Sequence, residues 1–578
     1  MFDSIIENGR WFDGTGAAAA VRHLGIRDGR VAAVSPDPLD RSGCGTIIDA
    51  AGKWVIPGIL DIHTHYDVEV LLEPSLAESV RHGVTTVLLG SCSLSTVHVD
   101  AEGAGDLFGR VEAIPRQFVI DAVGDRKTWH SAGEYAAALE RLPLGPNVAA
   151  FLGHSDIRTA AMGLDRATRK EVKPTAGELD AMQRNLIEAL DAGFVGMSSQ
   201  QLLFDKIDGE LCRSRTLPST YATTRERHRL NAILRQRDRA LQGGPDVTHP
   251  QSVVSMAMST LGIGRDPLKV SLLSAADLKA DPRIAKVFPI TARLLNRFGG
   301  NLRWQQLPVP FQVYADGIDF VIFEEFGSGA AALHLSNRIE ERRQLLRDEA
   351  YRRRFRKDYE RKFGTRVWHR DFFDAEIVDC PDESVIGRTF GQVGADRGVH
   401  PVDAFLDLVV EHGAKVRWRT TISNHREEVL NRFAADPGMQ LGFSDAGAHL
   451  RNMAFYNFGL RLLRRVYRAE QAGRPFMTVE HAVHRLTGEL ADWYGLDAGH
   501  LRVGDRADLA VIDPAKLDDS LDAYAESAVP CYGGLSRMVN RNDDTVNAVF
   551  VGGTYVFGDG AAAPEFGSRR TGQFLRTA

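Results

Sequence analysis

Cysteine is scarce in this chain. Five cysteines are scattered through 578 residues, and no two of them form a Cys-x-x-Cys pair: Cys44, Cys92, Cys212, Cys380 and Cys531. This spacing excludes the dense disulfide framework of small secreted proteins, and it leaves room for one functional thiolate.

Long apolar runs and a strong excess of one charge are also missing. No stretch reaches the roughly 18 apolar residues that a membrane span needs. The opening residues, MFDSIIENGR, lack the apolar segment of a secretory signal, so we expect a cytoplasmic protein with no membrane partner. A net charge of −6 gives no reason to expect nucleic acid as a partner. The 44% hydrophobic and 25% charged content is typical of a globular protein.

Both ends of the chain carry short strand-like segments joined by glycine-rich turns. Asp28-Gly29 marks a tight turn near the start, and Ala507–Ile512 and Val546–Val551 are strand-like segments near the end. We therefore expect residues 1–55 and 496–578 to build one small β-sandwich domain together.

Residues 56–495 alternate strand-like and helix-like segments, which favours parallel βα units. This pattern predicts an α/β fold, a (β/α)8 TIM-type barrel. The predicted barrel strands are Trp54–Ile62, Val84–Gly90, Val148–Leu152, Phe194–Ser198, Thr220–Thr224, Leu268–Leu272, Val416–Thr421 and Met439–Phe443.

A long gap separates the sixth and seventh predicted strands, so we expect an insertion within residues 275–385. It contains the arginine-rich run Asn337–Phe363 (NRIEERRQLLRDEAYRRRFRKDYERKF). Such a run is typical of a solvated helix with ion pairs along one face. The alternative is a lid whose arginines attract an acidic substrate, and the sequence leaves both interpretations open.

The most informative motif is an apolar strand that ends in His63-Thr64-His65, preceded by Pro57-Gly58 and Asp61. On a strand, residues i and i+2 point to the same face, so the two imidazoles should project into one site. In a TIM barrel, the carboxyl end of a strand is the catalytic mouth. Two such imidazoles suit a metal such as zinc.

This motif and its frame resemble the amidohydrolase superfamily, and within it the D-aminoacylases (N-acyl-D-amino-acid deacylases). The similarity extends over nearly the whole length. It includes Gly25–Val31 near the start, Gly387–His412 before the last strands, and Gly504–Leu509 in the closing segment. The resemblance implies a metal-dependent hydrolase of amide bonds on the barrel fold.

The resemblance also implies roles for two residues at strand ends. Cys92 follows the second strand, where the deacylases have a thiolate metal ligand; a small buried cysteine is the alternative. Asp445 follows the eighth strand, where the superfamily places its catalytic aspartate, a metal ligand and general acid/base. The alternative for Asp445 is a helix cap or turn.

Candidate substrate-binding residues come from three further segments. His154 and Arg158 match the Gly-His-x-x-x-Arg of the deacylases, and Ser199 matches their Gly-x-Ser-Ser. A structural histidine and a turn serine remain alternatives. His425 and His449 lie on loops after late strands and are further candidates for the pocket.

The chain departs from the deacylases at two positions. Thr224 and Leu272 stand where the resemblance would place histidine ligands on the fifth and sixth strands. We therefore predict a mononuclear centre of His63, His65 and Asp445 with Cys92 as a fourth ligand. It would hold one Zn²⁺ per chain, with a second metal left open.

The predicted function is hydrolysis of a C–N amide bond in a small molecule, such as an N-acyl amino acid that carries a carboxylate. The alternatives are other single-metal reactions of the superfamily, namely cyclic amide hydrolysis, deamination or decarboxylation. A catalytically inactive binding protein is a further alternative. The sequence leaves self-association into a homo-oligomer open.

Overall fold

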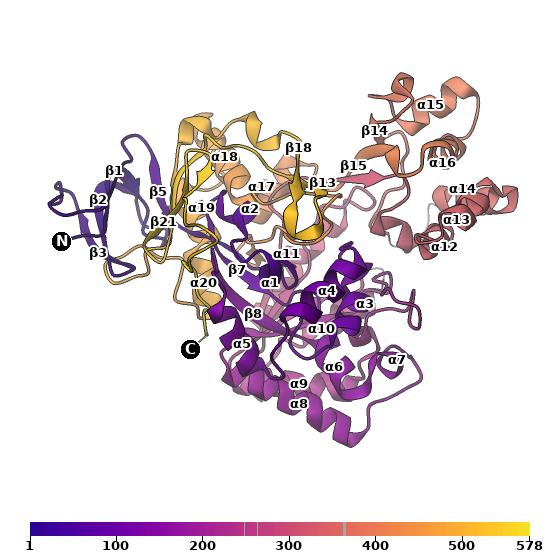
Figure 1. The fold of residues 1–578 in the computed structure, drawn as a ribbon, viewed down its shortest axis with the longest axis horizontal. Helices are drawn as coiled ribbons and strands as arrows, with labels where there is room; N and C mark the ends of the chain where they lie inside the picture. The colour runs from indigo at the N-terminus through magenta and orange to yellow at the C-terminus, as the bar shows by residue number, and fades with distance from the viewer. Residues whose placement is uncertain (248, 263, 362–365, 578) are drawn as a thin grey trace.

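Strands from both ends of the chain lie at one end of the molecule in the computed structural model, and a helical lobe lies at the other (Figure 1). The structure describes residues 1–247, 249–262, 264–361 and 366–577. Between these ends lies an α/β body. Within the described ranges, no helix is both long and apolar enough to cross a membrane.

Eight parallel strands form the sheet of this body. They are β6 (Ile59–Asp61), β7 (Val84–Leu89), β8 (Asn147–Gly153), β9 (Gly196–Gln200), β10 (Ala240–Gly244), β11 (Lys269–Leu272), β12 (Asn301–Gln305) and β16 (Met439–Gln440). The sheet closes on itself, because Ile62 N donates to Gly442 O at 2.8 Å and His65 N donates to Ala446 O at 2.7 Å. The predicted (β/α)8 barrel is confirmed.

The barrel strands are buried because helices cover the sheet. All six residues of β7 are buried. The helix α8 (Ala176–Asp191) illustrates how the covering layer forms. It begins at Thr175 with a reciprocal capping box to Glu178, and it buries Leu179, Met182 and Leu186 along one face.

Further helices surround the barrel. They are α1 (Glu69–Leu72), α2 (Ala77–Val80), α3 (Ala101–Gly109), α4 (Arg116–Arg126), α5 (Ala132–Arg141), α6 (His154–Met162), α7 (Leu164–Ala167), α9 (Thr224–Gln236), α10 (Pro250–Met258), α11 (Val287–Arg297), α17 (Glu427–Ala435), α18 (Phe458–Gln471), α19 (Val479–Leu486) and α20 (Gly488–Tyr494).

The strands from the two ends of the chain form one nine-stranded sheet. They are β1 (Ser4–Trp11), β2 (Ala20–Arg27), β3 (Arg30–Ser35), β4 (Thr46–Asp49), β5 (Trp54–Pro57), β17 (Leu509–Ile512), β20 (Val546–Val551), β21 (Thr554–Gly558) and β22 (Ala561–Ala562). The strand β5 joins the two sets, because it pairs with β1 on one side and with β17 on the other. It continues through Gly58 into the first barrel strand.

Two of the predicted barrel strands are wrong. Thr220–Thr224 is the end of a 3-10 turn followed by the first residue of α9, and Val416–Thr421 belongs to a strand outside the barrel. The fifth and seventh barrel strands are instead β10 and β12. Their sequences, ALQGG and NLRWQ, carry weak apolar signals because polar side chains from both strands contribute to the barrel interior.

The insertion lies later than the predicted 275–385, between β12 and β16. Its sheet contains β13 (Phe311–Asp316), β14 (Glu376–Asp379) and β15 (Arg417–Ser423) in the order β13-β15-β14. Its helices are α12 (Gly327–His334), α13 (Ile339–Arg347), α14 (Glu349–Glu360), α15 (Phe390–Arg397) and α16 (Pro401–His412). They form the lobe of Figure 1 and enclose a hydrophobic core of their own.

The arginine-rich run covers α13 and α14, and its last two residues, Lys362 and Phe363, lie outside the described part of the chain. Arg343 pairs with Glu340, and Arg352 pairs with Asp407 on α16. The first contact is an ion pair along a solvated helix, whereas Arg352 is buried and joins α14 to α16.

Candidate metal centre

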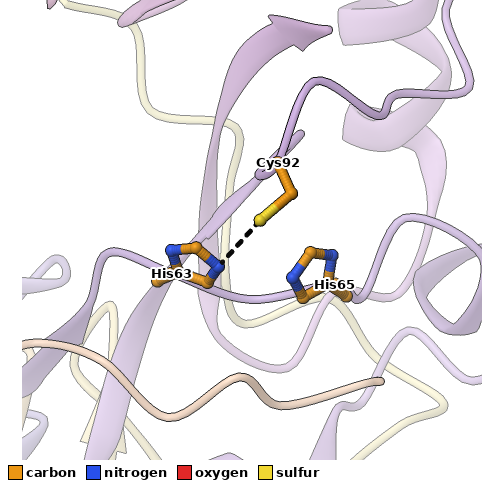
Figure 2. A group of neighbouring side chains, drawn as sticks. All are labelled: His63, His65 and Cys92. Carbon is orange, nitrogen blue, oxygen red and sulfur yellow. Dashed lines mark hydrogen bonds between the residues drawn. The ribbon is translucent and has the colours of Figure 1, made fainter. Parts of the chain in front are cut away.

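Three potential metal ligands meet at the mouth of the barrel (Figure 2). His63 and His65 follow β6, and Cys92 follows β7. One ligand atom from each of these residues lies within 4.8 Å of the other two, and Cys92 Sγ is 3.5 Å from His63 Nε2. All three residues are buried. The i, i+2 spacing on the strand therefore brings the imidazoles into one site, as the sequence predicts.

Asp445 completes this cluster from the loop after β16. Its Oδ1 lies 3.4 Å from His63 Nε2 and 3.1 Å from His65 Nε2. Its backbone has a φ of 61°, and the φ of Cys92 is 51°, so both residues occupy the left-handed region that non-glycine residues rarely adopt. Such backbone conformations cost free energy, so they persist only where the surrounding structure holds them in place. They are found most often at functional sites.

A hydrogen-bonded chain inside the barrel orients His63. Its Nδ1 lies 2.7 Å from Gln305 Oε1, which can only accept, so Nδ1 carries the proton and Nε2 presents its lone pair to the cluster. Gln305 Nε2 donates to Ser271 Oγ at 3.0 Å, and Ser271 donates to Gln440 Oε1 at 2.6 Å. An oriented imidazole of this kind is typical of metal-binding histidines.

Glu112 takes the corresponding place beside His65. Its Oε1 lies 3.3 Å from His65 Nδ1, and its backbone oxygen accepts from His449 N at 2.6 Å. Burial raises the pKa of Glu112 to about 8, opposed by the charge of His65. The hydrogen bond from His449 N to the backbone oxygen of Glu112 places His449 near the cluster. There, His449 and Asp445 both line the same cavity.

Burial shifts the pKa of two members of the cluster, His63 and Cys92. Burial lowers the pKa of His63 to about 4, so its imidazole is a neutral donor. Burial also raises the pKa of the Cys92 thiol to about 12, with Glu112 and Asp445 adding to the shift. A thiolate among carboxylates needs a positive charge beside it. Two imidazoles, a thiol and a carboxylate form the kind of donor set that zinc prefers.

The fifth and sixth barrel strands supply amide and hydroxyl groups to the centre. Gln242 on β10 accepts from Cys92 N at 3.1 Å and donates to Ser91 Oγ at 3.2 Å. Ser271 on β11 faces Gln305. The prediction that Thr224 ends the fifth strand is wrong, because this residue begins α9. Leu272 does end β11, and its side chain is buried in the main hydrophobic core.

A cavity of about 220 Å³ lies next to the cluster and includes His65, Cys92, Asp445 and His449 in its wall. The barrel forms one side of the wall. The insertion forms the other, with Phe320, the 3-10 turn Val321–Glu325, and Trp368. No arginine of α13 or α14 is among the described residues of this wall.

The other predicted substrate-binding residues lie elsewhere. His154 bonds to Ser199 Oγ at 3.0 Å and to Glu226 Oε1 at 2.9 Å, and Arg158 pairs with the second oxygen of Glu226. His154, Arg158 and Glu226 are fully buried. His425 lines a separate groove beside α18. None of these residues is part of the cavity wall.

Gln305, Gln242 and Glu112 are contacts that reasoning from the sequence missed. Gln242 lies in the middle of β10 and Gln305 ends β12, so correct strand boundaries would have placed both side chains on barrel strands. Glu112 lies in a loop after α3 and carries no pattern that would single it out.

The comparisons with known proteins bear on this geometry. No protein-family model matches the chain. An uncharacterized protein of Mycobacterium tuberculosis is 56% identical over 585 residues, which cover 100% of this chain and 96% of that protein. The N-acyl-D-aspartate deacylase of Alcaligenes xylosoxydans xylosoxydans is 25% identical over 580 residues, covering 99% of this chain and 95% of the deacylase.

A solved N-acyl-D-glutamate deacylase from Bordetella bronchiseptica, complexed with zinc and a phosphonate inhibitor, has the same fold. Its TM-score is 0.60 at 23% identity, over 100% of this chain and 99% of that one. The chain is therefore similar to the D-aminoacylases of the amidohydrolase superfamily in both sequence and fold.

The predicted resemblance is confirmed, and these relatives support a hydrolase that acts on C–N bonds other than peptide bonds. In this chain, the candidate ligands follow the first, second and eighth barrel strands. They gather at the carboxyl ends of the barrel strands, the catalytic face of TIM barrels.

Proposed function

We propose that the protein hydrolyses a C–N amide bond in a small molecule at a mononuclear metal centre. The observation that carries this proposal is the approach of Asp445 Oδ1 to the Nε2 atoms of both His63 and His65, at 3.4 and 3.1 Å. His63, His65, Cys92 and Asp445 would hold one zinc ion. When bound, zinc supplies a Lewis acid that polarises a carbonyl and lowers the pKa of water.

The side chains around the centre have separate tasks. Gln305 keeps the proton of His63 on Nδ1, and Gln242 fixes the backbone of Cys92. Asp445 is the group that takes a proton from water and returns it to the leaving amine, because its carboxylate faces the cavity. The apolar wall from the insertion excludes bulk water from this reaction.

One metal rather than two is supported by the residues on the fifth and sixth strands. Gln242 and Ser271 face the centre there, and neither is a strong zinc ligand. In the described part of the chain, only one group of three or more potential ligand residues has its ligand atoms within 4.8 Å of one another. It consists of His63, His65 and Cys92.

The test combines metal content with product identity. Zinc-reconstituted wild type should contain about one metal per chain and release an amine and a carboxylate from some members of an amide panel. Asp445→Asn should lose about 10²–10⁴-fold in kcat/KM. Ammonia or carbon dioxide as product would favour deamination or decarboxylation instead, and ring opening would favour cyclic amide hydrolysis. A metal-loaded protein that cleaves nothing in the panel would contradict the proposal.

A further inference from the structure

The cavity beside the metal centre has a largely apolar wall. From the insertion, Phe320, Val321, Ile322 and Trp368 contribute to it. From the barrel side come Leu202, Phe204, Leu273, Phe443 and Met453. Aromatic and aliphatic side chains therefore line the cavity on its barrel side and on its insertion side. Such a wall favours a substrate that has a large apolar part.

The charged groups in this wall are almost all acidic. They are Glu112, Asp205, Glu325 and Asp445, accompanied by the imidazoles of His65 and His449. Among the described residues that line the cavity, there is no lysine or arginine. This part of the wall therefore lacks the arginine guanidinium or lysine ammonium group that usually binds a carboxylate.

Three of these acids already have partners in the site. Asp445 and Glu112 face His65, and Glu325 pairs with Arg370 at 3.3 Å. Arg370 is thus paired with a glutamate and does not line the cavity. The same holds for Arg110, which pairs with Glu324.

Asp205 is different. Its Oδ2 accepts a hydrogen bond from Gln200 Nε2 at 2.6 Å, and it forms no ion pair with the described residues. The side chain is buried at the cavity wall, with 7% of the residue exposed. A buried carboxylate that has a neutral partner and faces a cavity is suited to an amine or an N–H donor from a ligand.

We propose that the site selects amides that carry no carboxylate, with a large apolar group and with a neutral or cationic remainder that Asp205 recognises. This inference rests on the proposed amide hydrolysis. A carboxylate placed in the cavity would lose its hydration and meet Asp205 and Glu112 without a cation among the described lining residues. This proposal is an alternative to the predicted carboxylate-bearing substrate, and the experiment below decides between them.

The inference separates this chain from the deacylases it resembles. Those relatives are named for N-acyl-D-aspartate and N-acyl-D-glutamate, compounds that carry two carboxylates. The fold and the metal-binding cluster are compatible with the same chemistry at the amide bond. The difference lies in the wall of the cavity, and it concerns which amides enter.

The experiment uses a matched set of amides on the zinc-loaded full chain. N-octanoyl-phenylalanine, in D and L forms, carries the carboxylate. N-octanoyl-phenethylamine lacks it, and a third analogue has an aminomethyl group in its place. We expect kcat/KM to be at least about tenfold higher for the second and third compounds than for either acid, a difference of about 1.4 kcal/mol. A preference for either acid would overturn the inference.

Binding to metal-loaded Asp445→Asn, measured by calorimetry with the same compounds, distinguishes the two proposals. If no compound is cleaved by wild type but the variant binds the neutral and cationic amides more tightly, the pocket inference stands and the proposed reaction fails. If the variant binds the acids at least as tightly, the pocket inference fails whether or not cleavage occurs.

Variants of the wall test the residue assignment. Asp205→Lys should reverse the preference, raising kcat/KM for the acid and lowering it for the cationic amide by about tenfold each. Because this change removes the bond to Gln200, Ser274→Arg adds a cation to the wall without that loss and should shift the preference in the same direction. Asp208→Asn, which removes an acid bound to Arg213 outside this wall, is the matched control. Equal preferences in all four proteins would overturn the role of Asp205.

Discussion

Gln305 and His63 are joined across the barrel by a contact of 2.7 Å between Gln305 Oε1 and His63 Nδ1. The two residues come from the seventh and first strands, so the bond forms only when the barrel has closed. It gives the imidazole one tautomer and one orientation. The metal-binding geometry of His63 therefore depends on a neutral side chain that could not itself hold the metal strongly.

Replacing Gln305 should weaken the metal centre without unfolding the protein. Gln305→Leu removes the acceptor for His63 Nδ1, so we expect zinc affinity to fall by about 10–100-fold. Competition with a chromophoric chelator measures this change. Gln305→Glu keeps an acceptor at the same place and should retain affinity within a few-fold of wild type. Equal affinity in the leucine variant and the wild type would show that the contact does not orient a ligand.

Cys92 should be required for full metal binding. Cys92→Ser replaces a thiolate with a hydroxyl, which is a much weaker zinc donor, and we expect the metal content per chain to fall well below that of the wild type after dialysis. Cys212→Ser provides the comparison, because Cys212 is also buried but is not part of the cluster. Elemental analysis of both variants measures the zinc content per chain. A full metal complement in Cys92→Ser would show that the thiol is not a metal ligand.

Gly447 should be intolerant of any side chain. Its φ is +91°, and a Cβ at this position would lie 2.7 Å from the backbone carbon and oxygen of His65. We expect Gly447→Ala to lower the free energy of unfolding by more than the about 1–3 kcal/mol of backbone strain alone, and to reduce metal binding by displacing His65. Gly473→Ala is the control, since Gly473 also has a positive φ but nothing lies within 4 Å of its Cβ position. Similar losses in both variants would mean that the collision with His65 is unimportant.

Glu226 should stabilise the fold and contribute to its acid sensitivity. Burial alone would raise its pKa, but the hydrogen bond with His154 and the charges of His154 and Arg158 lower it from 4.5 to about 2. A lowered folded-state pKa means that this contribution is complete above pH 4.5 and is lost as the pH falls towards 2. Its size is on the order of 3 kcal/mol.

Chemical denaturation of Glu226→Gln checks this expectation. At pH 7 the variant should be less stable than wild type by about 3 kcal/mol, and the difference should shrink as the pH falls below 4.5. Asp180→Asn breaks the exposed pair with Arg229 and should cost no more than about 1 kcal/mol. A constant difference between Glu226→Gln and wild type across this pH range would contradict the low pKa.

The barrel and the central histidines were predictable because they produce strong local signals. An apolar strand ending in His63-x-His65 fixes both the face and the end of the strand on which the imidazoles lie. Cys92 and Asp445 follow similar strands, and the resemblance to the deacylases indicated their roles. These four residues do gather in the structure.

The errors arose where barrel strands are short and polar. β10 contains Gln242 and two glycines, and β12 contains Asn301, Arg303 and Gln305, so neither resembles a buried strand. In contrast, β15 alternates buried and less buried residues and was mistaken for a barrel strand. The misplaced insertion followed from that error. Gln305 was missed for the same reason, because its role depends on a contact with a residue far away in sequence.

The pairing of β5 with β17 has a consequence for how the chain is made. Residues 54–57 find partners among residues 509–512, and Ile62 finds its partner at Gly442. During synthesis on the ribosome, β6 can pair with β7 early, but the other edge of β6 must wait for its partner until most of the polypeptide has emerged. We expect the barrel to close after translation rather than during it, so the nascent chain should depend on chaperones that shield early strands from aggregation.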